Sequence, residues 1–308
     1  MVGCEIALRP NQFCNLVEIN AMNIESQDDF NDRAKAASFI GTLQAGYTDF
    51  HYLRPIWRQN TEKDALLGVS MTGIASMKVF DFNINEAVEK VIEVNKKISS
   101  IIGINAAARS TCVKPAGTTS LVLGSSSGIH AWHNDYYIRR LRVGKNEAIY
   151  DYLSKNHPNL VEDEMFRPND TAVISVPQKA PKGSVTRHES ALELLDRVKT
   201  ITENWVKPGH IDGQNTHNVS ATISIKNEEW ESVGDWMWRN RNMYNGLSVL
   251  PYDNGSYQQA PFEDIDEKQY EELVKSLENI DLTYVVEDSD ETNLSDQAAC
   301  AGGACEII

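Results

Sequence analysis

The sequence lacks long hydrophobic runs and has few basic residues. No apolar stretch approaches the roughly 20 residues that span a bilayer, and no charged segment followed by an apolar one, typical of a secretory signal, opens the chain. Lys and Arg number 29 against 44 Asp and Glu, so the formal net charge is −15. This balance disfavours non-specific binding to nucleic acid. We expect a cytoplasmic protein with neither a membrane nor a nucleic acid as partner.

Two common nucleotide-binding signatures are also missing. The chain contains neither the G-x-G-x-x-G of a Rossmann turn nor a glycine-rich loop ending in Gly-Lys-Ser/Thr. Small and hydroxylated residues gather instead in the segment 111–142, between hydrophobic flanks. Its portion PAGTTS offers successive backbone N–H groups and hydroxyls, and the start of a helix there adds partial positive charge. We interpret this portion as a cradle for a substrate phosphate, formed by Ala116, Gly117, Thr118, Thr119 and Ser120. The alternative is a polar loop between two buried elements.

Cysteine is scarce, with five in 308 residues. An odd number favours redox or catalytic chemistry over a disulfide framework. Cys4 and Cys14 lie near Glu5 in the opening segment, where the turn at residues 9–12 joins strand-like pieces into a finger or hairpin. Two thiols and a carboxylate would then share one end of it. The alternative is that both cysteines are small buried hydrophobes.

The last 22 residues differ in composition from the rest. The acidic and polar run that begins at Glu287 has too little apolar surface to offset its ordering entropy, so we expect a flexible tether. It carries Cys300 and Cys305, separated by Ala-Gly-Gly-Ala, whose glycines let the two sulfurs meet. Zinc would need two more ligands, and none lie nearby in the sequence. The tail is therefore interpreted as a redox shuttle.

Hydrophobic spacing between these motifs predicts alternating strands and helices. Helices are predicted over 28–44, 85–101, 147–155 and 189–206. Strands are predicted over 66–74, 171–176, 219–225 and 246–251. This order is typical of an α/β protein.

Taken together, the motifs resemble ribonucleotide reductase, and within it the adenosylcobalamin-dependent (class II) ribonucleoside-triphosphate reductases. The matching stretches are CEIAL at 4–8, FCNL at 13–16, GTLQA at 41–45, LLGVSMTG at 66–73, the cradle with YIRR at 137–140, NVS at 218–220 and the C-terminal C-x-x-x-x-C. They follow one another in the order of the family.

The resemblance implies an α/β fold of a particular kind. Residues 1–286 would form the second half of a ten-stranded α/β barrel with its central finger loop, and residues 287–308 the flexible redox tail. The N-terminal half of the barrel is then expected on a separate chain. Without that half the protein is expected to be inactive as a ribonucleoside-triphosphate reductase.

The resemblance also implies roles for individual residues. Adenosylcobalamin would generate a cysteine thiyl radical, with Glu5 as the general base and Cys14 as one of two reducing thiols. Cys300 and Cys305 would re-reduce the resulting disulfide and be reduced in turn by a thioredoxin-like protein. In the family, however, the radical cysteine stands two residues before the glutamate, where this chain has Gly3. Either the loop is rearranged so that Cys4 carries the radical, or the radical cysteine is missing.

Other interpretations stay open. The glycyl-radical branch is disfavoured because the C-terminus lacks Arg-x-x-Gly-Tyr, and the tyrosine relay of the di-iron branch is not evident. The chain is alternatively a non-catalytic nucleotide-binding remnant or regulatory subunit. A thiol oxidoreductase acting on proteins is a third interpretation, although the tail cysteines lack the helix-start context that lowers a thiol pKa.

Overall fold

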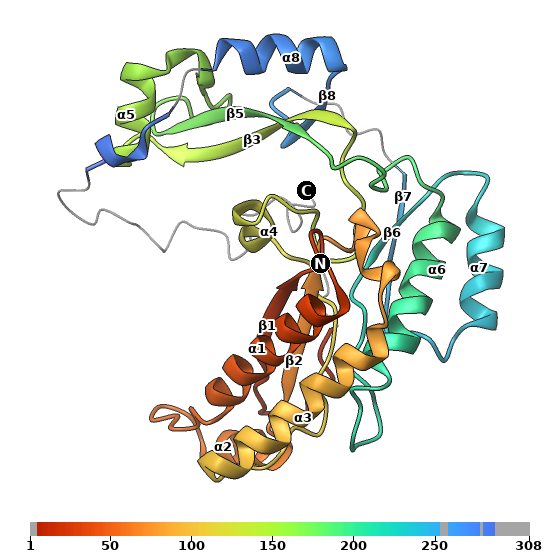
Figure 1. Ribbon diagram of the computed structural model, residues 1–308. Helices are drawn as coiled ribbons and strands as arrows, with labels where there is room; N and C mark the ends of the chain where they lie inside the picture. Colours follow the sequence, from red (N-terminus) through yellow and green to blue (C-terminus); the bar gives the residue numbers. More distant parts are fainter. Residues whose placement is uncertain (1–4, 253–257, 278–279, 287–308) are drawn as a thin grey trace. The chain divides into compact units, whose positions relative to one another are not determined.

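The computed structural model describes residues 5–252, 258–277 and 280–286 (Figure 1). Within these ranges the chain forms two compact units. The first comprises residues 5–131 and 183–252, and the second comprises residues 132–182 and those described after 257. No described helix is long and apolar enough to cross a membrane.

The first unit is built on parallel strands. Strand β1 (Asn15–Asn20) pairs with β2 (Leu67–Thr72), and β6 (Thr222–Ile225) pairs with β7 (Ser248–Pro251). A short extended stretch at residues 111–113 connects the two pairs, because it makes parallel bridges on both of its sides. The strand segments therefore follow one another across the unit in the order of the sequence.

Helices cover one side of these strands. They are α1 (Gln27–Ala45), α3 (Ile84–Ile102), α6 (Ala191–Ile201) and α7 (Trp230–Arg239). A further helix, α2 (Pro55–Asp64), buries Thr61 and Asp64, which bond to the opening segment. Shorter turns join them, namely η1 (Ile74–Ser76), η2 (Lys78–Asp81), α4 (Thr118–Val122) and the π-helical η4 (Thr202–Val206). Helix α1 begins where the Ser26 side chain accepts from the Asp29 N–H, and α3 ends at Gly103, whose φ of 75° suits glycine.

Side-chain alternation gives the strands two different faces. One face packs into the core beneath the helices, and its residues are Val17, Ile19, Val69, Met71, Val113, Ile223 and Ile225. The opposite positions carry polar and reactive groups, among them Glu18, Ser70, Cys112 and Lys114. The indole N–H of Trp205 bonds to the carbonyl oxygens of Val69 and Cys112, at 3.1 and 3.0 Å, which ties the core to the reactive strand stretch.

The second unit contains an antiparallel sheet in the order β4-β5-β3-β8. Its elements are β3 (Tyr136–Gly144), α5 (Ala148–Asn156), η3 (Pro158–Leu160), β4 (Val161–Asp163), β5 (Thr171–Lys179), β8 (Phe262–Asp264), α8 (Glu267–Ser276) and η5 (Leu282–Tyr284). Tyr137 lies opposite Gln178 on one side and Asp264 on the other, so β3 is a central strand.

The mixed α/β class expected from the sequence is confirmed, and the predicted helices are present as α1, α3, α5 and α6. The predicted helix 189–206 changes to a π-helical turn after Ile201. The prediction of a strand before the turn at 9–12 is wrong, because Ile6 and Leu8 lie in irregular backbone. The boundary between a catalytic part at 1–286 and a tail at 287–308 stays a prediction, since residues 287–308 lie outside the described residues.

Candidate functional site

The opening segment is held at its start by the loop before β6. The backbone N–H of Asn218 donates to the carbonyl oxygen of Glu5 at 2.9 Å, and the N–H of Ala7 donates to His217 Nδ1 at 3.1 Å. His217 Nε2 in turn donates to the carbonyl oxygen of Leu67 at 2.8 Å. Burial lowers the pKa of His217 to about 4, so the ring is neutral and serves as a structural link.

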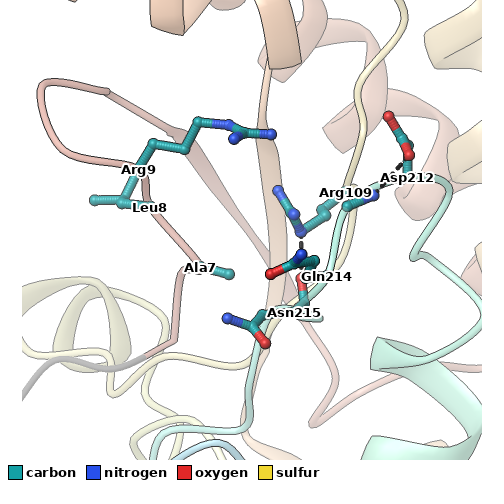
Figure 2. A pocket seen from close by; sticks show the side chains of 8 residues that line it. Ala7, Leu8, Arg9, Arg109, Asp212, Gln214 and Asn215 are labelled. Carbon is teal, nitrogen blue, oxygen red and sulfur yellow. Dashed lines mark hydrogen bonds between the residues drawn. The ribbon is translucent and has the colours of Figure 1, made fainter.

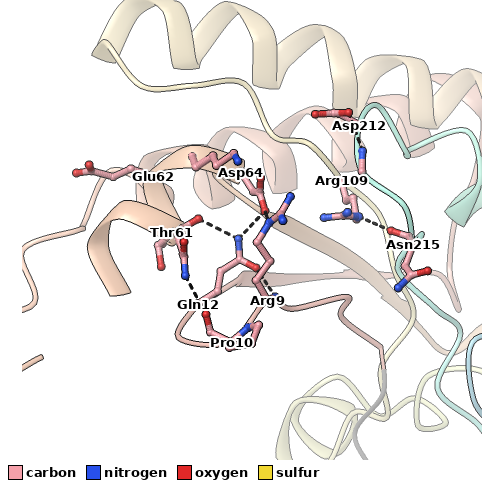
Figure 3. A network of polar contacts seen from close by, with 12 residues as sticks. Arg9, Pro10, Gln12, Thr61, Glu62, Asp64, Arg109, Asp212 and Asn215 are labelled. Carbon is pink, nitrogen blue, oxygen red and sulfur yellow. Dashed lines mark hydrogen bonds and ion pairs between the residues drawn. The ribbon is translucent and has the colours of Figure 1, made fainter. Parts of the chain in front are cut away.

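The turn of the opening segment is fixed by a polar network (Figure 3). Arg9 Nε lies 2.7 Å from an Asp64 carboxylate oxygen, which also accepts from Gln12 Nε2 at 2.8 Å. Asn60 supplies the other contacts, donating to the carbonyl oxygen of Pro10 and accepting from Gln12. These bonds return the chain to Cys14, which directly precedes β1.

Glu5, Cys14 and Cys112 lie within electrostatic reach of one another. Burial is the main cause that raises the pKa of the Cys14 thiol to about 12, and the negative charge of Glu5 contributes to this rise. Cys112 is fully buried, and burial raises its pKa well above the ordinary value, with contributions from Cys14 and Glu5. Both thiols are therefore protonated at neutral pH, which makes them weak nucleophiles that keep their S–H hydrogens.

Two carboxylates near these thiols each have a buried oxygen without a hydrogen-bond partner among the described residues. Glu5 Oε2 is buried and has no hydrogen-bond partner within the described part of the chain. Glu18 pairs with Lys114 Nζ at 2.8 Å through one oxygen, while its other oxygen is buried and lacks a partner among the described residues. Buried polar atoms without partners are costly, so these oxygens are suited to a ligand that donates hydrogen bonds.

The predicted cradle follows directly after Cys112 and Lys114. The Ala116 N–H is already used, because it donates to Ser127 Oγ at 2.9 Å. The Ser120 hydroxyl donates to the carbonyl oxygens of Ala116 and Gly117 at 2.5 and 2.8 Å. Helix α4 begins after Gly117, where the first N–H groups have no partner within the helix. The backbone of Thr118 and Thr119 is thus the part of the cradle that best suits a phosphate.

The cradle loop is held against the carboxyl end of β2. Thr72 Oγ1 accepts from the Gly128 N–H at 3.0 Å and donates to the Ser126 carbonyl oxygen at 2.9 Å. Gly128 has a φ of 56°, and a Cβ there would collide with the Lys114 carbonyl oxygen. Ligands of parallel α/β sheets bind at the carboxyl ends of strands, which is where this loop lies.

The structure therefore brings only some of the sequence-predicted residues together. Glu5 and Cys14 come together, and the cradle follows the strand stretch that carries Cys112. Cys4, Cys300 and Cys305 lie outside the described residues, and the roles of all these residues stay predictions. Sequence reasoning did not single out Cys112, Glu18 or Lys114. Their alternation opposite the core positions of the same strands was the signal that could have found them.

Comparisons with known proteins agree with the family resemblance found in the sequence. No family model matches the chain. A protein of Lactobacillus acidophilus is 26% identical over 98% of this chain, and one of Lactobacillus leichmannii is 27% identical over the same share. Each is named an adenosylcobalamin-dependent ribonucleoside-triphosphate reductase. The chain is homologous to ribonucleotide reductases. It spans 44% of the length of these relatives, and the match fits a C-terminal portion.

A solved structure agrees with the fold of this chain. The crystal structure of a B12-dependent (class II) ribonucleotide reductase superposes with a TM-score of 0.73 at 22% identity. The similarity covers 89% of this chain and 41% of that one. At this identity the comparison supports the mixed α/β fold.

Proposed function

We propose that this chain supplies the C-terminal part of the catalytic site of a ribonucleotide reductase that makes deoxyribonucleotides for DNA replication. The observation that carries the proposal is the convergence of Glu5 and Cys14. A buried carboxylate oxygen without a described partner lies within electrostatic reach of a protonated thiol. The homologues favour this function over the alternative of a nucleotide-binding remnant or regulatory subunit.

The proposed reaction replaces the ribose 2′-hydroxyl by hydrogen. Glu5 accepts the proton of the 3′-hydroxyl as general base, and the 2′-hydroxyl leaves as water. Cys14 and a second thiol supply the two electrons and become a disulfide. The high pKa of Cys14 suits this role, because the thiol must retain its hydrogen until the substrate radical is formed. The backbone at Gly117, Thr118 and Thr119 binds the substrate phosphates.

The homologues are named adenosylcobalamin-dependent, and the assembled enzyme accordingly uses adenosylcobalamin. That cofactor supplies the radical which starts the reaction. The groups around Glu5 and Cys14 are carboxylates, thiols and an ammonium, which suit a nucleotide. They show no feature that selects a corrin ring, so we assign no residue of this chain to the cofactor.

In this proposal the strands β1, β2, 111–113, β6 and β7 form the second half of a ten-stranded barrel, and residues 5–14 form its finger loop. The parallel order of these strand segments supports the arrangement. The first half-barrel comes from a separate chain. Cys300 and Cys305 re-reduce the active-site disulfide and accept electrons from a thioredoxin-like protein.

The proposal is tested by reconstitution. The purified 308-residue chain is mixed with adenosylcobalamin, a dithiol and a ribonucleoside triphosphate, with and without the N-terminal half of a homologous reductase. We expect deoxyribonucleotide only in the assembled mixture, and none after Glu5→Gln. Glu25→Gln, at an exposed position, is the matched control and should retain activity. Turnover by this chain alone would refute the split arrangement, and full activity of Glu5→Gln would refute the assignment of the base.

A further inference from the structure

A polar pocket with a volume of about 480 Å³ lies in the first unit, beside the turn of the opening segment (Figure 2). Its walls come from the opening segment, from the stretch before residue 111 and from the loop before His217. The lining residues are Ala7, Leu8, Arg9, Arg109, Asp212, Gly213, Gln214 and Asn215. The proposal above assigns no catalytic or substrate-binding role to any of these residues.

Arg109 is the central charge of this pocket. Only 6% of the residue is exposed, and its Nε–H donates to the carbonyl oxygen of Asn215. Within the described residues, Nη1 and Nη2 have neither a hydrogen-bond partner nor a carboxylate at ion-pair distance. The charge of Arg109 acts on Asp64, but that carboxylate already accepts from Arg9 and Gln12, so it offsets little of the desolvation cost of a second guanidinium. The pocket is therefore suited to an anion.

The loop on one wall is shaped around this guanidinium. Gly213 has a φ of 106°, and a Cβ at this position would collide with Arg109 Nη2. The Gly213 N–H donates to the Asp212 carboxylate at 2.8 Å, which holds that carboxylate in the loop. A residue other than glycine would thus displace either the loop or the guanidinium.

Three other charged side chains lie near the pocket, namely Arg9, Asp64 and Asp212. The guanidinium of Arg9 lies close to that of Arg109 in both close-up views (Figures 2 and 3). Arg9 is already paired with Asp64. Burial acts to raise the pKa of Asp64, but the hydrogen bonds from Arg9 and Gln12 hold this pKa below its usual range. Asp212 is an exposed carboxylate at the rim, where it competes with an incoming anion.

We propose that this pocket is a binding site for a small oxyanion, a phosphate or carboxylate group, held by Nη1 and Nη2 of Arg109. The planar fork of an arginine binds such groups through two parallel hydrogen bonds. Arg9 adds long-range attraction, and its pairing with Asp64 leaves Arg109 as the main ligand. The site is separate from the proposed substrate cradle, because no cradle residue lines it.

Titration of the full chain with inorganic phosphate, and separately with acetate, tests the proposal. Calorimetry at constant ionic strength is carried out in a Gly117→Val background, so that the cradle does not contribute. We expect saturable binding that Arg109→Gln weakens roughly tenfold or more. Arg109→Lys keeps the charge without the fork and should lose part of this affinity. Arg239→Gln removes an exposed arginine on α7 and should change nothing.

Asp212→Asn provides a second measurement that does not depend on a buried substitution. Removal of the competing carboxylate should tighten phosphate binding about two- to threefold. Binding of phosphate assigns the site to phosphate groups, and binding of acetate alone assigns it to carboxylates. The proposal is overturned if neither anion binds, if Arg109→Gln binds as tightly as the parent, or if Asp212→Asn weakens binding.

Discussion

At the scale of single residues, the surroundings of each titratable group determine its chemistry here. Burial favours the neutral form of three side chains: it raises the pKa of Cys14 and of Cys112, and it lowers the pKa of His217. In each case burial is the largest cause of the shift. A site that keeps its thiols protonated differs from a thiol oxidoreductase, which lowers the pKa of its attacking cysteine. This difference disfavours the described cysteines as nucleophiles.

The alkylation rate of Cys14 tests its raised pKa. At pH 9 a thiol with a pKa of about 12 has a thiolate fraction several hundredfold below that of a thiol with the ordinary pKa of 9.0. Iodoacetamide should therefore modify Cys14 far more slowly in the folded protein than in urea, as followed by peptide mass spectrometry. Glu5→Gln should accelerate the folded-state reaction, because it removes a charge that raises the pKa. Equal rates in folded and unfolded protein would contradict the assignment.

His217 should make stability depend on acid pH. Its folded pKa is about 4 against an ordinary 6.5, so between these values the unfolded chain binds a proton that the folded chain does not. The free energy of unfolding should therefore fall as the pH decreases from 6.5 to 4, by about 3 kcal/mol from this residue.

Urea unfolding between pH 4 and 7 measures this effect. Because carboxylates also titrate in this range, the informative quantity is the difference between variants. His217→Gln should have lower stability at pH 7 and a shallower decline toward pH 4. His51→Gln, at an exposed position, should keep the parent's slope. An unchanged slope in His217→Gln would show that this histidine is not buried in its neutral form.

At the scale of elements, the loop between the 111–113 stretch and α4 connects the reactive strand face to the cradle. Ser127 anchors this loop through the hydrogen bond from the Ala116 N–H, and Thr72 anchors the segment that carries Ser127 through the hydrogen bond from the Gly128 N–H. The loop thus has a defined shape before any ligand arrives. Such preorganisation lowers the entropy cost of binding.

Gly117→Val tests the cradle. A branched side chain just before α4 should obstruct the approach of a phosphate to the backbone, so nucleotide affinity in the assembled enzyme should fall about tenfold or more. Stability should change much less. Gly234→Ala is the control, because a Cβ there on α7 meets no atom within 4 Å. Unchanged nucleotide affinity in Gly117→Val would remove the cradle from the proposed site.

At the scale of the whole molecule, the homology concerns a chain that spans 44% of its relatives' length. The proposed reaction needs a second reducing thiol and a way to restore it after each cycle. Cys14 is the reducing thiol that this chain is proposed to provide, and the tail cysteines are proposed to restore it. Turnover number is therefore the property that separates these two tasks.

Cys300→Ser and Cys305→Ser should each permit about one round of reduction in the assembled enzyme and then stop. The first round uses internal thiols, while later rounds require direct thiolate attack on the active-site disulfide. Cys14→Ser should abolish even the first round. Rapid-quench measurement of product per site separates the two results. Sustained turnover of both tail variants with a protein reductant would end the shuttle assignment.

The sequence by itself determined the local elements and the family resemblance. The spacing of apolar residues located α1, α3 and β2, because a helix or strand repeats its buried face at a fixed interval. The stretches from CEIAL at 4–8 to the C-terminal C-x-x-x-x-C carried the resemblance, because each is a contiguous segment that can be compared without knowing its distant contacts. The antiparallel β3–β5 pairing was not predicted, although the strand at 171–176 was.

Only the tertiary structure decided which distant groups meet. Cys112 lies within electrostatic reach of Cys14, and Glu18 pairs with Lys114, because β1, β2 and the 111–113 stretch lie side by side in a parallel register. The pocket at Arg109 exists because Gly213, more than 100 residues away, takes up a conformation that admits the guanidinium. Such contacts depend on strand order, register and loop geometry, and no local periodicity in the sequence records them.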